Sequence, residues 1–257
     1  MIDRRELMEK ARKFNLPLGI VEKDYVLGWM LYGIREYLPE LVFKGGTALS
    51  KIYFPEVWRL SEDLDFNAAE KDNFNQMIDI FEQKILHFLE QKSGIRFQLN
   101  SKFSNSQYLQ IKVQYLGVLE FRNFVKIDIS KHENIEEPII RKLKAVYSDY
   151  PQFMVKVKTL NEIFAAKVRT ILERTKCRDY FDLWKLLDYV KVDEIQKLIL
   201  LKCGKKEIDF GKLFEKTEEL DQYWKREMPR LVSPVPELDK VLADLKNKLA
   251  ANHRRVS

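Results

Sequence analysis

The sequence has few of the residues that build disulfide frameworks and zinc sites. Its 257 residues include two cysteines, Cys177 and Cys203, and three histidines, and the cysteines are too far apart to form a C-x-x-C pair. Small disulfide-rich folds and structural zinc sites need several such residues at short spacings. The composition therefore argues against both classes.

Long apolar runs are also missing. The longest candidate, residues 25–34, falls well short of the roughly 20 residues that a membrane-spanning helix needs. The opening segment, MIDRRELMEKARK, mixes both charges and has no apolar centre, so we expect no signal peptide. The expected location is the cytoplasm, without membrane attachment.

Neither low-complexity segments nor internal repeats are present. Hydrophobic residues make up 46% of the chain and charged residues 33%, a balance typical of a folded soluble protein. The length suits one large domain or two modest ones. The net charge of +6 is compatible with a polyanionic partner such as RNA, but a modest basic excess alone does not identify one.

Periodicity predicts an α+β fold. Helical spacing indicates two helices in residues 1–38 and a long amphipathic helix over 72–91 that Gly94 ends. Strand-like runs cover 95–103, 108–115 and 123–130, with Gly117 in the turn before the last. From residue 159 the pattern is helical, with a break near 175–177 and three or four more helices over 191–250.

These elements predict two domains. A small mixed sheet with N-terminal helices is expected over residues 1–158, and a helical bundle over 159–257. The boundary is a change of composition rather than a flexible linker. We therefore expect the second domain to complete an active-site cleft over the first.

One stretch, KGGTALSKIYFPEVWRLSEDLDF at residues 44–66, carries the chemistry. Gly45 and Gly46 let the backbone approach a bulky anion, and the N–H groups of the following helix start can point at phosphate oxygens. Asp63 and Asp65 alternate with apolar residues, so in a strand they share one face with Cα atoms about 6.6 Å apart. Two such carboxylates repel unless a cation neutralises them. The stretch predicts a site for a metal-bound nucleoside triphosphate.

A later strand carries another acid on its polar side. In FVKIDIS, residues 124–130, apolar Val125, Ile127 and Ile129 face one way and Lys126 and Asp128 the other. An acid inside an apolar strand needs a partner if it is buried. From the strand alone, Asp128 fits a solvent-facing edge position and a functional role equally well.

The strings KGGTALSK and RLSEDLDF resemble the AbiEii family of nucleotidyltransferase toxins, within the polymerase β-like superfamily. That superfamily carries a Gly-Gly or Gly-Ser pair followed by Asp-x-Asp. The gap between Gly46 and Asp63 is longer than its norm and similar to that of AbiEii-type proteins. The resemblance implies a Mg²⁺ site formed by Asp63, Asp65 and Asp128. Phosphate contacts are expected from Gly45, Gly46, Thr47 and Ser61.

A second group of charges lies in AAKVRTILERTKCRDYFDLW, residues 165–184. Lys167, Arg174 and Arg178 share one helical face if the helix continues through the predicted break, and Asp179 and Asp182 share a face of the next helix. In most helices such charges form a solvated surface. The string resembles an AbiEii-type motif with a helix lysine before Arg-Asp-x-x-Asp. That resemblance implies Lys167 and Asp182 as active-site residues, with Arg178 and Asp179 contacting substrate.

Other charged residues are interpreted as structural. Glu22, Lys23 and Asp24 are expected to be solvated in the first turn of a helix, where acids are favoured, with a supporting contact to the nucleotide site as the alternative. Lys51 is expected on the surface. No GxxxxGK[ST] motif can be drawn through GGTALSK, which excludes a P-loop enzyme.

The sequence thus predicts a Mg²⁺-dependent nucleotidyltransferase that moves a nucleoside monophosphate from an NTP to an acceptor hydroxyl. The resemblance implies tRNA as the acceptor and a toxin role opposed by a cognate antitoxin. Two alternatives stay open: an acceptor that is a small molecule or a protein, and a catalytically silent protein that binds nucleotide or RNA.

Overall fold

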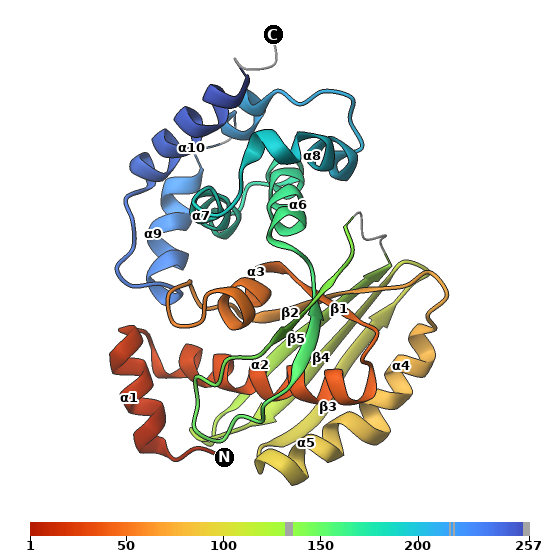
Figure 1. The fold of residues 1–257 in the computed structure, drawn as a ribbon. Helices are drawn as coiled ribbons and strands as arrows, with labels where there is room; N and C mark the ends of the chain where they lie inside the picture. The colour runs from red at the N-terminus through yellow and green to blue at the C-terminus, as the bar shows by residue number, and fades with distance from the viewer. Residues whose placement is uncertain (132–135, 216, 218, 254–257) are drawn as a thin grey trace. The chain divides into compact units, whose positions relative to one another are not determined.

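The computed structural model describes residues 1–131, 136–215, 217 and 219–253 (Figure 1). Its contacts divide the chain into two compact units. The first takes the described residues of 1–134, 138–157 and 231–233, and the second those of 135–137, 158–230 and 234–257. The main division follows Val157, one residue before the predicted boundary.

The first unit is built on a mixed sheet. Within the described residues it has seven strands in the order β3-β4-β5-β2-β1-β7-β6. The strand pairs are antiparallel except for β2 with β5 and β1 with β7. A mixed sheet in one unit and helices in the other confirm the predicted α+β class. The strands are β1 (Val42–Lys44), β2 (Asp63–Ala68), β3 (Arg96–Ser104), β4 (Tyr108–Leu116), β5 (Arg122–Lys131), β6 (Ile139–Lys142) and β7 (Met154–Val157).

The alternation in β4 and β5 gives the sheet two different faces. Leu109, Ile111 and Val113 of β4 are fully buried, and Ile127 and Ile129 of β5 are too. The residues between them are half-buried and mostly polar. Successive strand residues point to opposite sides, so one face forms the core and the other is polar. We call this polar side the open face.

The long helices of the first unit, α2 (Leu18–Tyr37) and α5 (Leu86–Ser93), cover the apolar face (Figure 1). Local signals set their ends: the Asp3 carboxylate accepts a hydrogen bond from the Glu6 N–H, and Gly94 takes a left-handed conformation after the last helical residue. The predicted long helix runs continuously from Phe74 to Ser93. The elements are α1 (Arg4–Phe14), α2 (Leu18–Tyr37), α3 (Gly45–Ala48), α4 (Phe74–Ile80) and α5 (Leu86–Ser93), with wider π-type turns η1 (Leu49–Tyr53) and η2 (Phe81–Ile85).

The second unit is helical in its described residues, as expected. Thr159 caps its first helix by accepting the Glu162 N–H, and the predicted break near 175–177 separates α6 from α7. Both α7 and α8 pack on α6, while α9 and α10 pack on α7. The elements are α6 (Leu160–Glu173), α7 (Cys177–Leu186), α8 (Gln196–Cys203), α9 (Leu220–Glu227) and α10 (Leu238–His253), with short 3₁₀ turns η3 (Val192–Ile195), η4 (Phe210–Phe214) and η5 (Met228–Arg230).

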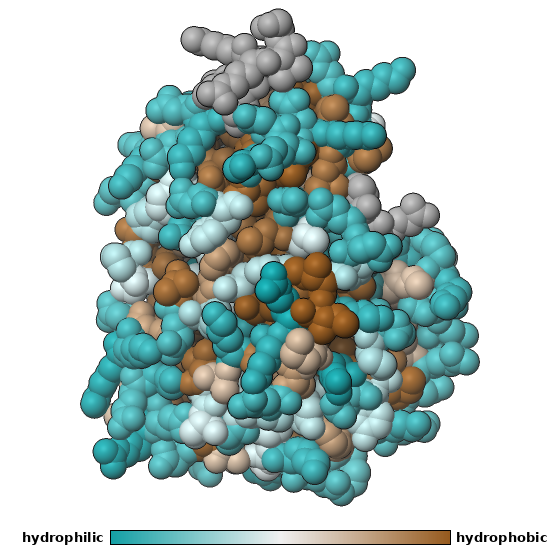
Figure 2. Space-filling model, viewed as in Figure 1, coloured by the Kyte–Doolittle hydropathy of each residue, from teal (hydrophilic) through white to brown (hydrophobic). Residues whose placement is uncertain are grey.

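Hydrophilic side chains dominate the surface seen in Figure 2, in keeping with a chain that is one-third charged. Among the described residues, no helix combines the length and apolar character needed to cross a bilayer.

Candidate active site

The acidic residues of β2 lie on the open face of the sheet. Leu64 and Phe66 are buried on the core side, while Asp63 and Asp65 are half-buried on the other. The parallel partner β5 puts Asp128 directly opposite Asp65 and Lys126 opposite Asp63. Neighbouring strands lie about 4.8 Å apart, so the three predicted acids form one group, the acidic cluster. Because β5 lies between β4 and β2, the alternative that Asp128 sits on an edge strand is wrong.

A lysine lies within the acidic cluster. The Lys126 Nζ is 2.8 Å from the Asp128 Oδ2 and 3.8 Å from the Asp63 Oδ2. Partial burial lowers the pKa of Lys126. The hydrogen bond that Lys126 donates to Asp128 and the charges of Asp63, Asp128 and Asp65 outweigh this effect and raise the pKa above its ordinary value. Lys126 is therefore a built-in counter-charge for the carboxylates.

The other Asp128 oxygen is held by β4. The Tyr108 hydroxyl donates to the Asp128 Oδ1 at 2.5 Å, and the Gln110 amide donates to the same oxygen at 3.0 Å. Burial, followed by the bond to Asp128, raises the pKa of Tyr108 well above its ordinary range, so the phenol remains a donor at neutral pH. These contacts fix the carboxylate while it is charged.

The glycine turn lies against Asp65. Gly45 has a φ of 79°, and a Cβ at this position would lie 2.6 Å from the Asp65 Oδ2. The fully buried Thr47 donates its hydroxyl to the Asp63 carbonyl, which ties the turn to β2. The Thr47 side chain thus has a structural partner, so the phosphate contact predicted for Thr47 would come from its backbone N–H.

Two further predicted or neighbouring residues lie at this end of the sheet. Lys44, opposite Asp65 in the β1–β2 ladder, donates to Asn67 and Ser130 at 2.6 Å each. No role was expected for Lys44 from the sequence, although its place directly before the two glycines was a usable signal. Ser61 is buried in the segment leading into β2.

The donor chemistry of the acidic cluster suits a hard cation such as Mg²⁺, which prefers carboxylate oxygens. As placed, no group of three His, Cys, Asp or Glu side chains among the described residues is arranged to hold a metal ion. Lys126 lies where two of the carboxylates would converge. The cluster fits magnesium by charge and ligand type, with Lys126 turned aside.

The charges predicted for the second unit form a buried cluster rather than a solvated face. The Lys167 Nζ is 2.7 Å from the Asp179 Oδ1 and 2.7 Å from the Asp182 Oδ2. Burial opposes ionisation of Asp179, but Lys167 and then Arg174 outweigh it and lower the pKa of this carboxyl. Arg178 is half-buried in the first turn of α7. The structure thus brings together Lys167, Asp179 and Asp182 within this unit.

Two expectations about the first unit are wrong. Lys51 is 5% exposed rather than a surface residue, and its Nζ lies 2.8 Å from Asp24, which also accepts the Tyr147 hydroxyl. Glu22 is 1% exposed and accepts the Leu119 N–H at 2.7 Å. The missed signal was that α2 is apolar on nearly every side, and a helix of that kind is buried all round.

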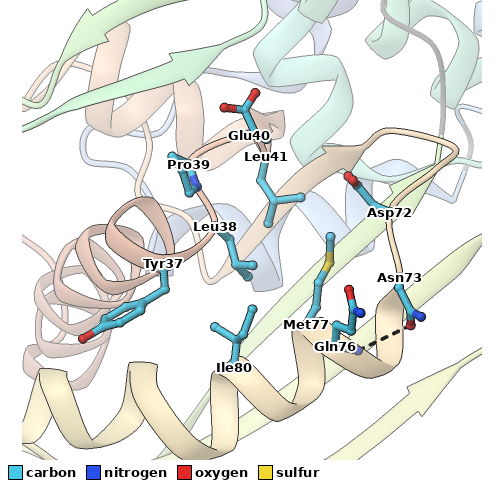
Figure 3. A pocket seen from close by; sticks show the side chains of 10 residues that line it. All are labelled: Tyr37, Leu38, Pro39, Glu40, Leu41, Asp72, Asn73, Gln76, Met77 and Ile80. Carbon is cyan, nitrogen blue, oxygen red and sulfur yellow. Dashed lines mark hydrogen bonds between the residues drawn. The ribbon is translucent and has the colours of Figure 1, made fainter.

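A hollow of about 220 Å³ lies at the other end of β1 (Figure 3). Leu38, Leu41, Met77 and Ile80 form apolar walls, and Glu40 and Asp72 bring two acids to it. Glu40 pairs with Lys156 at 2.5 Å. The residues that line this hollow include no glycine and no Lys or Arg, whereas the acidic cluster has Gly45 and Lys126 beside it. The polar end of β1 and β2 therefore stays the better candidate for a triphosphate site.

Comparison with known proteins identifies the family. Residues 29–250 match the family model described as nucleotidyl transferase AbiEii toxin, type IV toxin–antitoxin system. No curated protein matches the chain. Among solved structures, MenT4, a nucleotidyltransferase toxin of Mycobacterium tuberculosis H37Rv, has a similar fold, with a TM-score of 0.70 at 18% identity over 97% of this chain and 87% of that one. The chain belongs to the AbiEii family of nucleotidyltransferase toxins of type IV toxin–antitoxin systems.

Proposed function

We propose that this nucleotidyltransferase moves a nucleoside monophosphate from a Mg²⁺-bound NTP to a hydroxyl of tRNA in the cytoplasm, and that a cognate antitoxin opposes it. One observation carries the proposal. Asp65 lies opposite Asp128 on neighbouring strands, with Gly45 packed against the Asp65 carboxylate. A metal–phosphate site needs this combination of convergent oxygen ligands and close backbone approach.

In this proposal Asp63, Asp65 and Asp128 hold magnesium. Bound there, magnesium would supply the positive charge that favours ionisation of the acceptor hydroxyl and departure of pyrophosphate. Lys126 keeps the carboxylates neutralised before loading, and Tyr108 keeps Asp128 oriented. The Asp128 carboxylate is thereby held in place before magnesium binds, and Lys126 has to turn aside for the three acids to converge.

The phosphates are bound by backbone and side chain together. The first N–H groups of a helix have no partner within it, so those of Gly45, Gly46 and Thr47 are suited to phosphate oxygens. Ser61 adds a hydroxyl contact, and Arg178 is the proposed bidentate phosphate clamp.

The AbiEii motif supports a role for Lys167 in the reaction. Lys167, oriented by Asp179 and Asp182, neutralises negative charge that builds on the transferring phosphate. The acceptor oxygen forms a bond to the α-phosphorus, and the bond from that phosphorus to the bridging oxygen breaks. Pyrophosphate leaves, and a carboxylate of the acidic cluster takes the hydroxyl proton.

Labelled NTPs test the proposal directly. The protein is incubated with each α-labelled NTP and bulk tRNA, with Mg²⁺ or with excess chelator, and RNA is separated from small products. We expect label on RNA with Mg²⁺ and none with excess chelator. The rate of labelling should fall at least roughly 100-fold in Asp65→Asn. The matched control is Asp79→Asn, at an exposed position of α4.

The alternatives predict different outcomes of that assay. Label on a small molecule or on protein, with unlabelled RNA, would replace tRNA as the acceptor. Mg²⁺-dependent NTP binding without label on any product would point to a silent nucleotide-binding protein.

A further inference from the structure

The part of the open face formed by β3, β4 and β5 extends away from the glycine turn and has its own chemical character. Four cations, three aromatic residues and three amides lie on it according to the strand registers. Within these three strands the sequence has one acid, Asp128, which belongs to the acidic cluster. These cations, aromatic residues and amides are Arg96, Gln98, Phe103, Tyr108, Gln110, Lys112, Gln114, Arg122, Phe124 and Lys126, and Ser101, Leu116 and Ser130 share the same face.

Two of these aromatics are available for stacking. Phe103 is 59% exposed on edge strand β3, although a phenylalanine usually buries its ring. Phe124 is half-buried on β5, with the Lys112 Nζ 4.3 Å from its ring centre. Exposed rings beside lysines are the elements with which proteins hold single-stranded nucleic acid, because bases stack on rings while cations follow the phosphates.

The register connects this surface to the acidic cluster. Phe103 pairs with Gln110, Gln110 with Asp128, and Asp128 with Asp65. With about 4.8 Å between strands, Phe103 lies about 10 Å from Asp128 across the sheet. A strand of RNA whose reacting hydroxyl lies at Asp128 would pass over β4 and β3.

The size of the surface favours RNA over the base of the NTP. Arg122 lies six residues along β5 from Asp128, which corresponds to about 20 Å. A single nucleotide with its triphosphate at the glycine turn cannot also reach that cation. A chain of several phosphates can.

We propose that the open face of β3, β4 and β5 binds the single-stranded end of the acceptor RNA, with Phe103 and Phe124 as stacking positions and Lys112 and Arg122 as phosphate contacts. This inference rests on the proposed function, because there the acceptor is RNA. It adds the surface that selects the acceptor.

Anisotropy of a fluorescein-labelled short single-stranded RNA tests the surface, with no NTP present. We expect Phe103→Ala and Phe124→Ala each to weaken RNA binding about tenfold. Lys112→Ala should reduce the salt slope of the binding constant by about 0.7. The control is Phe121→Ala, which removes a ring that is 76% exposed but precedes β5. Thermal melts check folding, and NTP binding to each variant is measured separately.

Each result decides the inference. It is supported if the two ring variants lose RNA affinity while Phe121→Ala and NTP binding are unchanged. It is overturned if wild-type protein does not bind the RNA or if only Lys112→Ala weakens RNA binding. It is also overturned if Phe103→Ala and Phe124→Ala lose NTP affinity to the same extent as RNA affinity. RNA binding without any transfer would instead refute the proposed function and leave the surface standing.

Discussion

At the scale of single residues, Gly45 meets two demands at once. Its φ of 79° lies in the left-handed region that other residues adopt at a cost, and its missing side chain makes room for the Asp65 carboxylate. Both demands are met by a single glycine in the native chain, but substitution can measure the energetic cost of each one separately.

Gly45→Ala is expected to lower the free energy of unfolding by more than Gly94→Ala. Gly94 also has a positive φ, 71°, but a Cβ there would meet its nearest atom at 3.8 Å, an ordinary contact. In the Gly94→Ala control, backbone strain alone lowers the free energy of unfolding, by about 1–2 kcal/mol. Gly45→Ala has the same strain and must also displace Asp65. Urea unfolding of both variants checks this, and equal losses would contradict the described contact.

Residue-level prediction from the sequence worked where periodicity alone decides. Alternation in DLDF and in FVKIDIS was enough to put Asp63, Asp65 and Asp128 on the polar side of their strands, as the structure has them. It was not enough to find Lys126 between two carboxylates, because that contact depends on which strands are neighbours. Nor could it find Lys51 with Asp24, since the pairing joins two helices 27 positions apart.

At the scale of elements, α2 is an interior helix with charged side chains inside it. Glu22 accepts the Leu119 N–H and Asp24 pairs with Lys51, so both acids have partners. Burial raises the pKa of Glu22, and the N–H groups of Leu119 and Val118 offset the effect only in part. The helix thus contributes a pH dependence to stability.

The direction of this pH dependence follows from the linkage between proton binding and folding. A carboxyl with a raised folded pKa stabilises the protein at pH values below its unfolded pKa, and this contribution is lost as pH rises through the folded pKa. Glu22→Gln removes the titration and keeps an oxygen to accept the Leu119 N–H. Melting curves should therefore show the variant gaining stability relative to wild type between pH 4 and pH 7.

Glu9→Gln, at an exposed position of α1, is the control for the exchange itself. If the difference between Glu22→Gln and wild type stays constant over this pH range, burial does not govern the titration of Glu22.

At the scale of the whole molecule, the chain combines two compact units with a charged cluster in each. The helix–sheet–helix order could be predicted because each segment has a clear period and clear end signals, such as Gly94 and Thr159. The strand order could not, since β1 inserts between β2 and β7 through contacts that are distant in sequence. The family assignment adds that such an enzyme acts within a toxin–antitoxin pair.

Variants in the two units should separate binding from chemistry. Asp65→Asn is expected to lose both Mg²⁺-dependent NTP binding and transfer. Lys167→Met is expected to keep NTP binding and lose transfer by at least roughly 100-fold, with lower stability because two buried carboxylates lose their shared cation.

Calorimetric NTP titration and the labelling assay, run below the melting temperature of each variant, provide the two readouts. Lys248→Met on α10, an exposed lysine, is the control. Wild-type transfer by Lys167→Met would exclude Lys167 from the chemistry.

The position of β2 in the middle of the sheet has a consequence for motion. β2 is hydrogen-bonded to β1 on one side and to β5 on the other, so sliding it would break two ladders at once. Turnover nevertheless requires part of the site to move each time a substrate enters and a product departs. The backbone beneath Asp63 and Asp65 is too constrained to do so, whereas the Lys126 side chain, 38% exposed, can swing outward at the cost of its ion pairs alone.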